Sequence, residues 1–571
     1  MPTKKIYTNT LAQIWGKVLT AIISIGMIKI LTGYLDIAGY GLYSKIYNFL
    51  SIFAVIADLG LYTITVRELS AHKDDPKMVD TIASNVLTLR TLSGCLIFIF
   101  SITIGYFLDG YNSREALIGM WIASFFTLLG LINSSLMSYL QSILKTEFSI
   151  VANTVGKLMT LGMIMVFAGL MWGNSHTEKF TYVMIAGLAG NLVMTALTWW
   201  YANRWHPVHF GWDTHYIRHI LVTSLPYGLA LFLNVIFFKV DTILLSIMEP
   251  RELSDSVIAL YALPMKIVEV GMMYGTVFLN SLLPVLTGAF QREKKKQNNP
   301  EDTVISECMH DLASEWVFLS SWGTKDLLRN WPNFSTSILR SRASAEDGSF
   351  EMTEMSPPTL KHSSHPPHQH SSSLITHAYT LLLFFGIGIS AFLFLTRWEV
   401  TRIISTESFV TTIIHGFTSI DAMAIVVWIF LFYFISSLST FILIAHGRQK
   451  TMMYVNSGIA LLNIIGNILI IPHYSFVGSA VVTLISQILL LICTWWLVRE
   501  DMPLRHILPK TSIILILWVL SMLFAYGVML IFPHDRTFIG NSTSLILTGW
   551  VFTFVYLTGF FLMRHQLLSR K

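Results

Sequence analysis

The stretch TMMYVNSGIALLNIIGNILII at residues 451–471 indicates what kind of protein this chain forms. A membrane-spanning helix needs about 20 consecutive, mostly apolar residues, and this stretch supplies them without a charged side chain. Its asparagines, Asn456, Asn463 and Asn467, recur at helical spacing and therefore share one face. The pattern predicts a transmembrane helix whose polar face packs against other helices rather than lipid.

About fourteen segments of this kind follow one another along the chain, which predicts an all-α polytopic membrane protein. The composition agrees, because 53% of the 571 residues are hydrophobic and only 12% are charged. The predicted spans are residues 11–32, 42–66, 86–108, 116–138, 149–172, 182–202, 219–247, 256–288, 377–396, 421–444, 451–471, 475–498, 511–532 and 543–563.

The charged residues between the spans predict the side of the membrane that each connection faces. Lys294 to Lys296, and Arg448 with Lys450, lie in alternate connections, whereas the connections at 109–115 and 249–255 are balanced or acidic. The positive-inside rule places the basic connections and both termini in the cytoplasm. An even number of spans requires the same placement of the termini.

One polar segment, residues 291–376, interrupts the series of spans. Its end is rich in Ser, Pro and His and has too few apolar residues to fold, which predicts a partly disordered cytoplasmic insertion. Its histidines are open to adventitious metal binding, but a solvated linker is the favoured interpretation, because no carboxylate accompanies them. No metal site is predicted.

Lysines inside the predicted spans carry the functional prediction. A charge at the bilayer centre costs about 3 kcal/mol on insertion scales and usually faces a cavity or a partner. Lys17 and Lys157 have no acidic neighbour on their own helical face, which favours a cavity role over packing. Asn153 lies one turn before Lys157 on the same face.

Two further spans carry ionisable residues. In the seventh, Asn234 and Asp241 share a face, while Lys239 points elsewhere; in the eighth, Lys266 and Glu269 lie one turn apart and are able to pair. Either these residues line a substrate cavity or they are packing contacts between helices. Because cations outnumber anions in the first half, the cavity suits an anionic substrate. The candidate cavity residues are Lys17, Asn153, Lys157, Asn234, Lys239, Asp241, Lys266 and Glu269.

The sequence contains no pattern typical of catalysis. It has no Ser-His-Asp set, no HExxH and no phosphate-binding glycine loop, so a non-enzyme without a cofactor is expected. The net charge of +5 comes from basic connections on one side of the membrane and does not indicate nucleic-acid binding. The three cysteines, Cys95, Cys308 and Cys493, are far apart and predict no disulfide framework.

Short motifs along nearly the whole chain, the insertion excepted, show a consistent order. They are YLDIAGYGLY at 34–43, ADLGL at 57–61, RELS at 67–70, SLPYG at 224–228, KVDTI at 239–243, LPVL at 283–286, AHGRQK at 445–450 and PHYSFVGSA at 472–480. Together they resemble the polysaccharide flippases, for O-antigen and other lipid-linked oligosaccharides, of the multidrug/oligosaccharidyl-lipid/polysaccharide exporter superfamily.

The resemblance implies two six-helix lobes around a central cavity, followed by two C-terminal helices that form a groove for a lipid tail. The corresponding parts are residues 1–202, the second lobe at 203–290 and 377–498, and the additional helices at 499–571, with 291–376 inserted. It further implies alternating-access export of a polyprenyl-diphosphate-linked oligosaccharide across the inner (cytoplasmic) membrane. Lys17, Lys157 and Lys239 would face the diphosphate, membrane lipids would be partners, and a coupling cation is an open possibility.

Three alternatives remain open at this point. A lipid II flippase and a multidrug antiporter belong to the same superfamily, although an antiporter for cationic drugs favours exposed carboxylates, and Asp241 and Glu269 each have a lysine close in sequence. A membrane polysaccharide polymerase or ligase belongs to a different class. Such an enzyme is expected to carry a large periplasmic loop, whereas the large loop here is predicted to be cytoplasmic.

Overall fold

The computed structural model describes residues 2–72, 75–143, 145–170, 175–205, 207–298, 369–502, 504–531 and 538–568. These residues are almost entirely helical, and within them the only β-structure is a bridge between Ile414 and Phe417. The helices are α1 (Pro2–Asp58), α2 (Leu61–Ala71), α3 (Pro76–Phe107), α4 (Arg114–Ser142), α5 (Thr146–Gly169), α6 (His176–Asn203), α7 (Thr214–Met248), α8 (Arg251–Asn298), α11 (Gln369–Leu395), α12 (Arg397–Ile404), α13 (Glu407–Thr411), α14 (Ser419–Ala445), α15 (Gln449–Leu497), α16 (Leu504–Ile531) and α17 (Phe538–Leu568).

Eleven helices within the described ranges are long and apolar enough to cross a membrane. Two of these regions, Leu19–Ala71 with 53 residues and Gln449–Leu497 with 49, each have the length of two crossings. A shorter apolar helix lies at Leu547–Phe561. The all-α polytopic fold is therefore confirmed, and the described helices accommodate the predicted series of about fourteen spans.

Single residues divide the two long regions. Asp36, with φ 60° and ψ −170°, interrupts α1, and Ser475, with φ 50° and ψ −137°, interrupts α15. Few residues other than glycine adopt a positive φ, so each of these positions breaks the helix sharply. The Asp36 carboxylate accepts a hydrogen bond from the Gly39 amide at 2.9 Å, as a helix N-cap does. The first break separates the first two predicted spans, and the second separates the eleventh from the twelfth.

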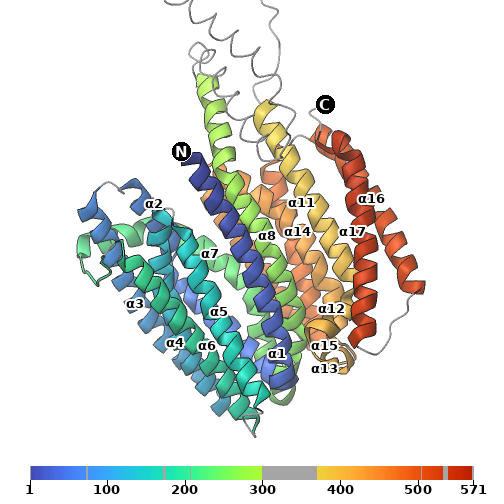
Figure 1. Ribbon diagram of the computed structural model, residues 1–571, viewed down its shortest axis with the longest axis horizontal. Coiled ribbons are helices and arrows are strands. Elements are labelled where there is room, and N and C mark those ends of the chain that lie inside the picture. The colour runs from blue at the N-terminus through green and yellow to red at the C-terminus, as the bar shows by residue number, and fades with distance from the viewer. Residues whose placement is uncertain are drawn as a thin grey trace, which may run out of the picture. The chain divides into compact units, whose positions relative to one another are not determined.

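The helices pack in two groups that α7 connects (Figure 1). Helices α3, α4, α5 and α6 pack on one another, while α14 packs on α15 and α16 on α17. The start of α7 contributes Tyr216, Ile217 and Ile220 to a buried cluster with α2, α3 and α4, whereas Phe237 near its other end packs on α15. Between them, Gly228 lies so close to Leu59 that a Cβ atom would fall 2.4 Å from its carbonyl, and only glycine fits.

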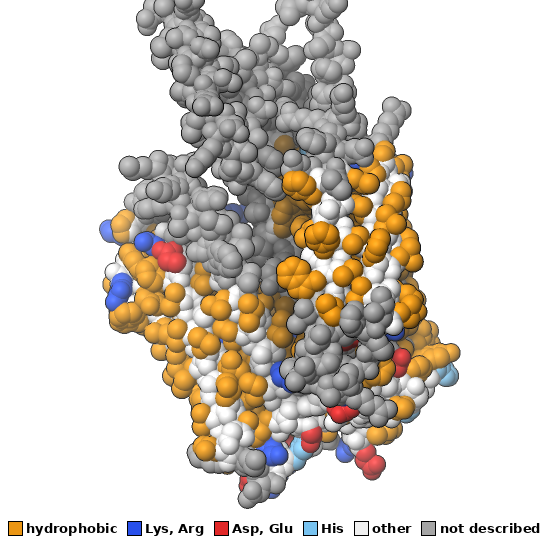
Figure 2. All heavy atoms as spheres, turned by 45° about the vertical axis from the view of Figure 1, so that its right-hand side comes forward, with side chains coloured by type: hydrophobic (Ala, Val, Ile, Leu, Met, Phe, Trp, Pro, Cys, Tyr) orange, Lys and Arg blue, Asp and Glu red, His pale blue; other side chains and the backbone are white. Residues whose placement is uncertain are grey.

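The surface of the described helices is apolar where lipid is expected. Figure 2 shows one face on which hydrophobic side chains cover the helices, while charged side chains gather toward their ends. Helix α16 exposes Leu523 and Phe524, and α17 exposes Trp550 and Phe554. Because lipid rather than water is the natural contact for such side chains, these helices have the lipid-facing character predicted for them.

The chain divides into two units, residues 1–283 with 375–571, and residues 284–374. In the second unit, the described residues 284–298 and 369–374 belong to α8 and α11. Residues 299–368 of the predicted insertion lie outside the described residues. The disorder predicted for the insertion and the boundaries predicted for the two lobes stay predictions.

Candidate functional site

One carboxylate lies between two lysines where α7 meets α8. The Glu269 side chain accepts a hydrogen bond from Lys239 Nζ at one oxygen and from Lys266 Nζ, 3.1 Å away, at the other. Lys239 and Glu269 are largely buried, whereas the Lys266 side chain is 52% exposed. The structure therefore contains the Lys266–Glu269 pair that the sequence allowed, and it adds Lys239 from the neighbouring helix.

Lys157 of α5 lies near this group. Its ammonium donates a hydrogen bond of 3.0 Å to Ser24 Oγ of α1, and Lys157 is close enough to Lys266 for the two to interact electrostatically. Residues from four helices thus meet, and we call Ser24, Lys157, Lys239, Lys266 and Glu269 the lysine cluster. Three ammonium groups face a single carboxylate, so the cluster carries a net charge of about +2 when all four groups are ionised. Such a group can bind an anion.

The remaining candidates of the first half and of α7 are less well defined. Asn153 is half-buried on α5, one turn before Lys157. Lys17 and Asn234 lie in α1 and α7, but their side chains are outside the described residues. Their cavity roles stay predictions.

Asp241 lies in a different environment from the lysine cluster. Its carboxylate is fully buried and accepts hydrogen bonds from Tyr261 Oη at 2.5 Å, Thr483 Oγ1 at 2.6 Å and Asn467 Nδ2 at 3.2 Å. Asn467 also bonds to the backbone and side chain of Asn463. We call these five residues the buried acid cluster. All three bonds to the carboxylate come from neutral donors, so the cluster holds a negative charge without an ammonium partner in these contacts.

A second buried ion pair joins α1 to α8. The Lys45 side chain, only 3% exposed, pairs with Asp255 and donates a 2.7 Å hydrogen bond to the Gly110 carbonyl. The Tyr111 ring lies 5.5 Å from Lys45 Nζ, and burial raises the pKa of Tyr111, so its phenol stays neutral beneath the ammonium. We call Lys45, Asp255, Gly110 and Tyr111 the Lys45 latch.

The latch lies where α1 and α8 are closest. A Cβ atom on Gly41 would fall 1.7 Å from the Asp255 carbonyl oxygen, so these two helices touch backbone to backbone. Beside it, Arg251 forms an exposed ion pair with Asp109. These contacts join the connections at 109–115 and 249–255, which the charge pattern assigns to the external side.

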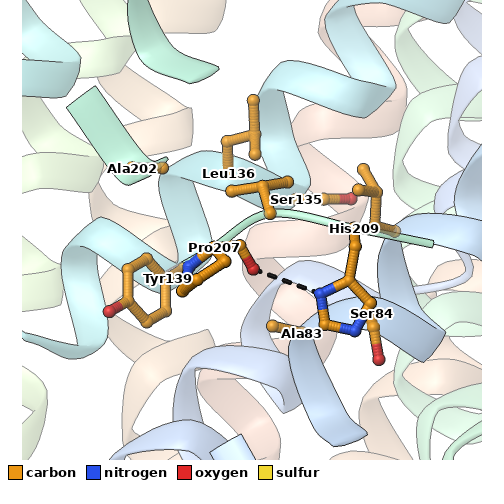
Figure 3. Close-up of a pocket in the computed structure, with 10 residues that line it drawn as sticks. Ala83, Ser84, Ser135, Leu136, Tyr139, Ala202, Pro207 and His209 are labelled. Atoms are coloured by element: carbon orange, nitrogen blue, oxygen red, sulfur yellow. Dashed lines mark hydrogen bonds between the residues drawn. The ribbon is translucent and has the colours of Figure 1, made fainter. Parts of the chain in front are cut away.

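The pocket drawn in Figure 3 lies apart from these clusters. It is lined by side chains of α3, α4 and α6 and by Pro207, Val208 and His209, and His209 Nδ1 lies 3.3 Å from the Pro207 carbonyl oxygen. The cavity measures about 20 Å³, which is room for a water molecule but not for a sugar or a diphosphate. It is therefore no candidate for the substrate site.

The sequence matches a known family over its first half, as the motifs predicted. The family described as polysaccharide biosynthesis protein matches residues 6–290. The chain belongs to the multidrug/oligosaccharidyl-lipid/polysaccharide exporter superfamily. It is accordingly a membrane transporter of the flippase type. No protein with a curated description matches it in sequence.

Solved structures share the fold of this exporter at low sequence identity. The lipid II flippase MurJ in an inward closed conformation has a TM-score of 0.60 at 12% identity, covering 98% of this chain and 99% of that one. An inward-facing multidrug resistance MATE family transporter of the superfamily has a TM-score of 0.54 at 12% identity, with 85% and 95% covered. A superfamily transporter from Pyrococcus furiosus, described as having a binding pocket of reverse polarity, also scores 0.54 at 12% identity, with 88% and 96% covered.

Several residues of these clusters were not among the sequence candidates. Ser24 could have been found, because it lies seven residues after Lys17 on the same helical face. Lys45 also carried a signal, since it is a lysine inside a predicted span. Tyr261 and Thr483 carried none, because only the packing of α8 and α15 on α7 brings them to Asp241.

Proposed function

We propose that this exporter carries a polyprenyl-diphosphate-linked oligosaccharide across the cytoplasmic (inner) membrane by alternating access, for cell-surface polysaccharide biosynthesis. The observation that carries the proposal is the charge of the lysine cluster. A diphosphate diester has about two negative charges, and the cluster offers about two uncompensated positive ones. The family match to polysaccharide biosynthesis proteins supports the same class of substrate.

Glu269 gives the cluster a way to hold its charge between transport cycles. With no anion bound, its two oxygens each accept a bond from an ammonium group, which offsets the repulsion between Lys239 and Lys266. An entering diphosphate supplies more acceptor oxygens than one carboxylate does. Lys266, the most exposed of the three lysines, is the one that reaches the diphosphate first.

The lipid portion of the substrate needs an apolar path. Helices α16 and α17, with their exposed leucines and aromatic side chains, are the surface that we assign to the polyprenyl tail. Membrane lipids occupy the same surface when no substrate is bound. Both termini are cytoplasmic in this proposal, because the basic connections lie on their side of the membrane.

The buried acid cluster is the place that we assign to a coupling cation. A carboxylate surrounded by hydroxyl and amide oxygens suits a proton or a small monovalent cation that binds oxygen ligands. Asp241 supplies the charge, while Thr483, Asn467 and Asn463 supply neutral oxygens. A cation bound there would help return the empty carrier to the cytoplasmic side.

A lipid II flippase is the second candidate, favoured by one observation. The likeness to the MurJ structure extends over 98% of this chain, whereas the MATE structure covers 85%. Lipid II is itself a diphosphate lipid, so the lysine cluster suits it equally. A drug-cation antiporter is disfavoured, because Glu269 is held between two lysines and Asp241 is fully buried.

Reconstitution into proteoliposomes tests the proposal. The protein is expected to move a polyprenyl-diphosphate oligosaccharide between leaflets, and lipid II added in excess should compete only weakly. Equal transport of lipid II would favour the second candidate, and efflux of a cationic drug without lipid movement would overturn the proposal. A tag at residue 340 addresses the enzyme alternative, since periplasmic exposure would favour a polymerase or ligase.

A further inference from the structure

The second half of α1 carries tyrosines at helical spacing that have different surroundings. Tyr40 is buried, and its ring lies edge-on to Phe409 of α13 with centroids 5.7 Å apart. Tyr43 and Tyr47 are only half-buried, with ring centroids 4.5 Å apart, and Tyr47 is edge-on to Phe126 of α4 at 5.1 Å. Tyr40 therefore packs the fold, whereas Tyr43 and Tyr47 retain accessible ring surface. We call these two residues the tyrosine shelf.

The shelf lies beside the lysine cluster. Tyr43 is close enough to Lys266 for the phenol and the ammonium to interact electrostatically. Ser44 and Asn48, on the same part of α1, are half-buried polar neighbours, and Asn48 Nδ2 donates a 3.1 Å hydrogen bond to Thr242 Oγ1 of α7. Aromatic surface, hydrogen-bonding side chains and an ammonium group are thus close together, as in sites that fix the orientation of a small polar ligand.

A sugar ring is the ligand that uses all of these groups. A neutral pyranose presents C–H bonds on its face, which the negative face of an aromatic ring attracts, and hydroxyl groups at its edge, which amide and hydroxyl side chains bind. A diphosphate held by Lys266 brings the sugar bonded to it next to Tyr43. We propose that the tyrosine shelf binds the sugar directly attached to the diphosphate, and that this sugar is a neutral pyranose.

This inference rests on the proposed function and makes it more specific. If the first sugar stacks on the shelf, selection among glycans depends on the sugar nearest the lipid and little on the sugars beyond it. Two lipids with the same first sugar and different outer sugars would then be transported alike. The competing explanation is that Tyr43 and Tyr47 serve only to pack α1 against α4.

The experiment compares two lipids in proteoliposomes, a polyprenyl diphosphate bearing one neutral hexose and the same polyprenyl diphosphate without sugar. Tyr43→Leu is expected to raise the KM for the sugar-bearing lipid about tenfold, a change of about 1.4 kcal/mol, and to leave the sugarless lipid unaffected. Tyr43→Phe keeps the ring and is expected to retain most of the transport. Tyr106→Leu is the matched control, because Tyr106 is a tyrosine with an exposed ring on α3.

The sugarless lipid separates the possible outcomes. An equal loss for both lipids in Tyr43→Leu would mean that the tyrosine supports the fold or the gate, and it would overturn the inference. An unchanged KM for the sugar-bearing lipid would overturn it as well. Wild-type protein that moves neither lipid would refute the proposed function, and with it the role of the shelf, whereas wild-type transport of both lipids leaves the variants to decide.

Discussion

Replacing Asp255 by asparagine should open the transporter toward the outside. The change removes the anionic partner of Lys45, whose side chain is 3% exposed. Breaking a buried ion pair by removing one partner costs roughly 3–5 kcal/mol. Asp255 is itself 28% exposed, and the Gly110 carbonyl still accepts a bond from Lys45, so about 2 kcal/mol is a fair expectation for the closed state.

If the latch forms only when the outer side is closed, this loss shifts the equilibrium between the closed and open states. A change of about 2 kcal/mol corresponds to roughly a 30-fold shift toward the outward-open state. The assay is the rate at which a membrane-impermeant maleimide, added from outside, labels a Ser44→Cys reporter. The native cysteines, Cys95, Cys308 and Cys493, are replaced by serine in this background.

Arg251→Gln provides the control for this experiment. It removes an ion pair at the same edge of the protein, but both partners, Arg251 and Asp109, are mainly exposed, so the expected change in labelling is less than about fivefold. Labelling that stays at the wild-type rate in Asp255→Asn would refute the latch. An equal increase in both variants would show that general loosening, rather than loss of the buried pair, exposes the reporter.

Three further outcomes are expected. Lys157→Ala should abolish export at a normal protein level, while Lys157→Arg retains part of it because the positive charge survives; normal export by the alanine variant would make Lys157 a packing residue. Asp241→Asn should make transport insensitive to an imposed proton or sodium gradient, and a retained response would place the coupling site elsewhere. Collapsing the membrane potential with valinomycin and potassium should slow net translocation, since moving two charges outward is worth about 5 kcal/mol per 100 mV; an unchanged rate would leave the substrate gradient as the driving force.

Helical spacing in the sequence was sufficient for contacts within one helix and insufficient for contacts between helices. It identified Lys266 and Glu269 as a possible pair, because they lie one turn apart. It gave no means of bringing Lys239 to Glu269 or Lys45 to Asp255, because such pairings depend on how separate helices are rotated and packed. The apolar spans, by contrast, were readable directly, since the bilayer imposes length and hydrophobicity on each span separately.

Asp241 shows the same limit in a different form. The sequence placed it on one face of the seventh span with Asn234, and it placed Asn463 and Asn467 together on the eleventh. Both assignments concern single helices. That Asn467 donates to Asp241, and that Tyr261 of α8 does so too, follows only from the packing of three helices around one buried carboxylate.

The break at Asp36 has a consequence for how the length of this chain can vary. A single left-handed residue, bonded to Gly39 and at 3.0 Å to His176 Nε2, takes the place of a connecting loop. A loop absorbs an inserted or deleted residue as slack, but this turn has none. One extra residue here would rotate the following helix by about 100° and turn Lys45 away from Asp255. Residues 34–45 should therefore tolerate substitution more readily than any change in length.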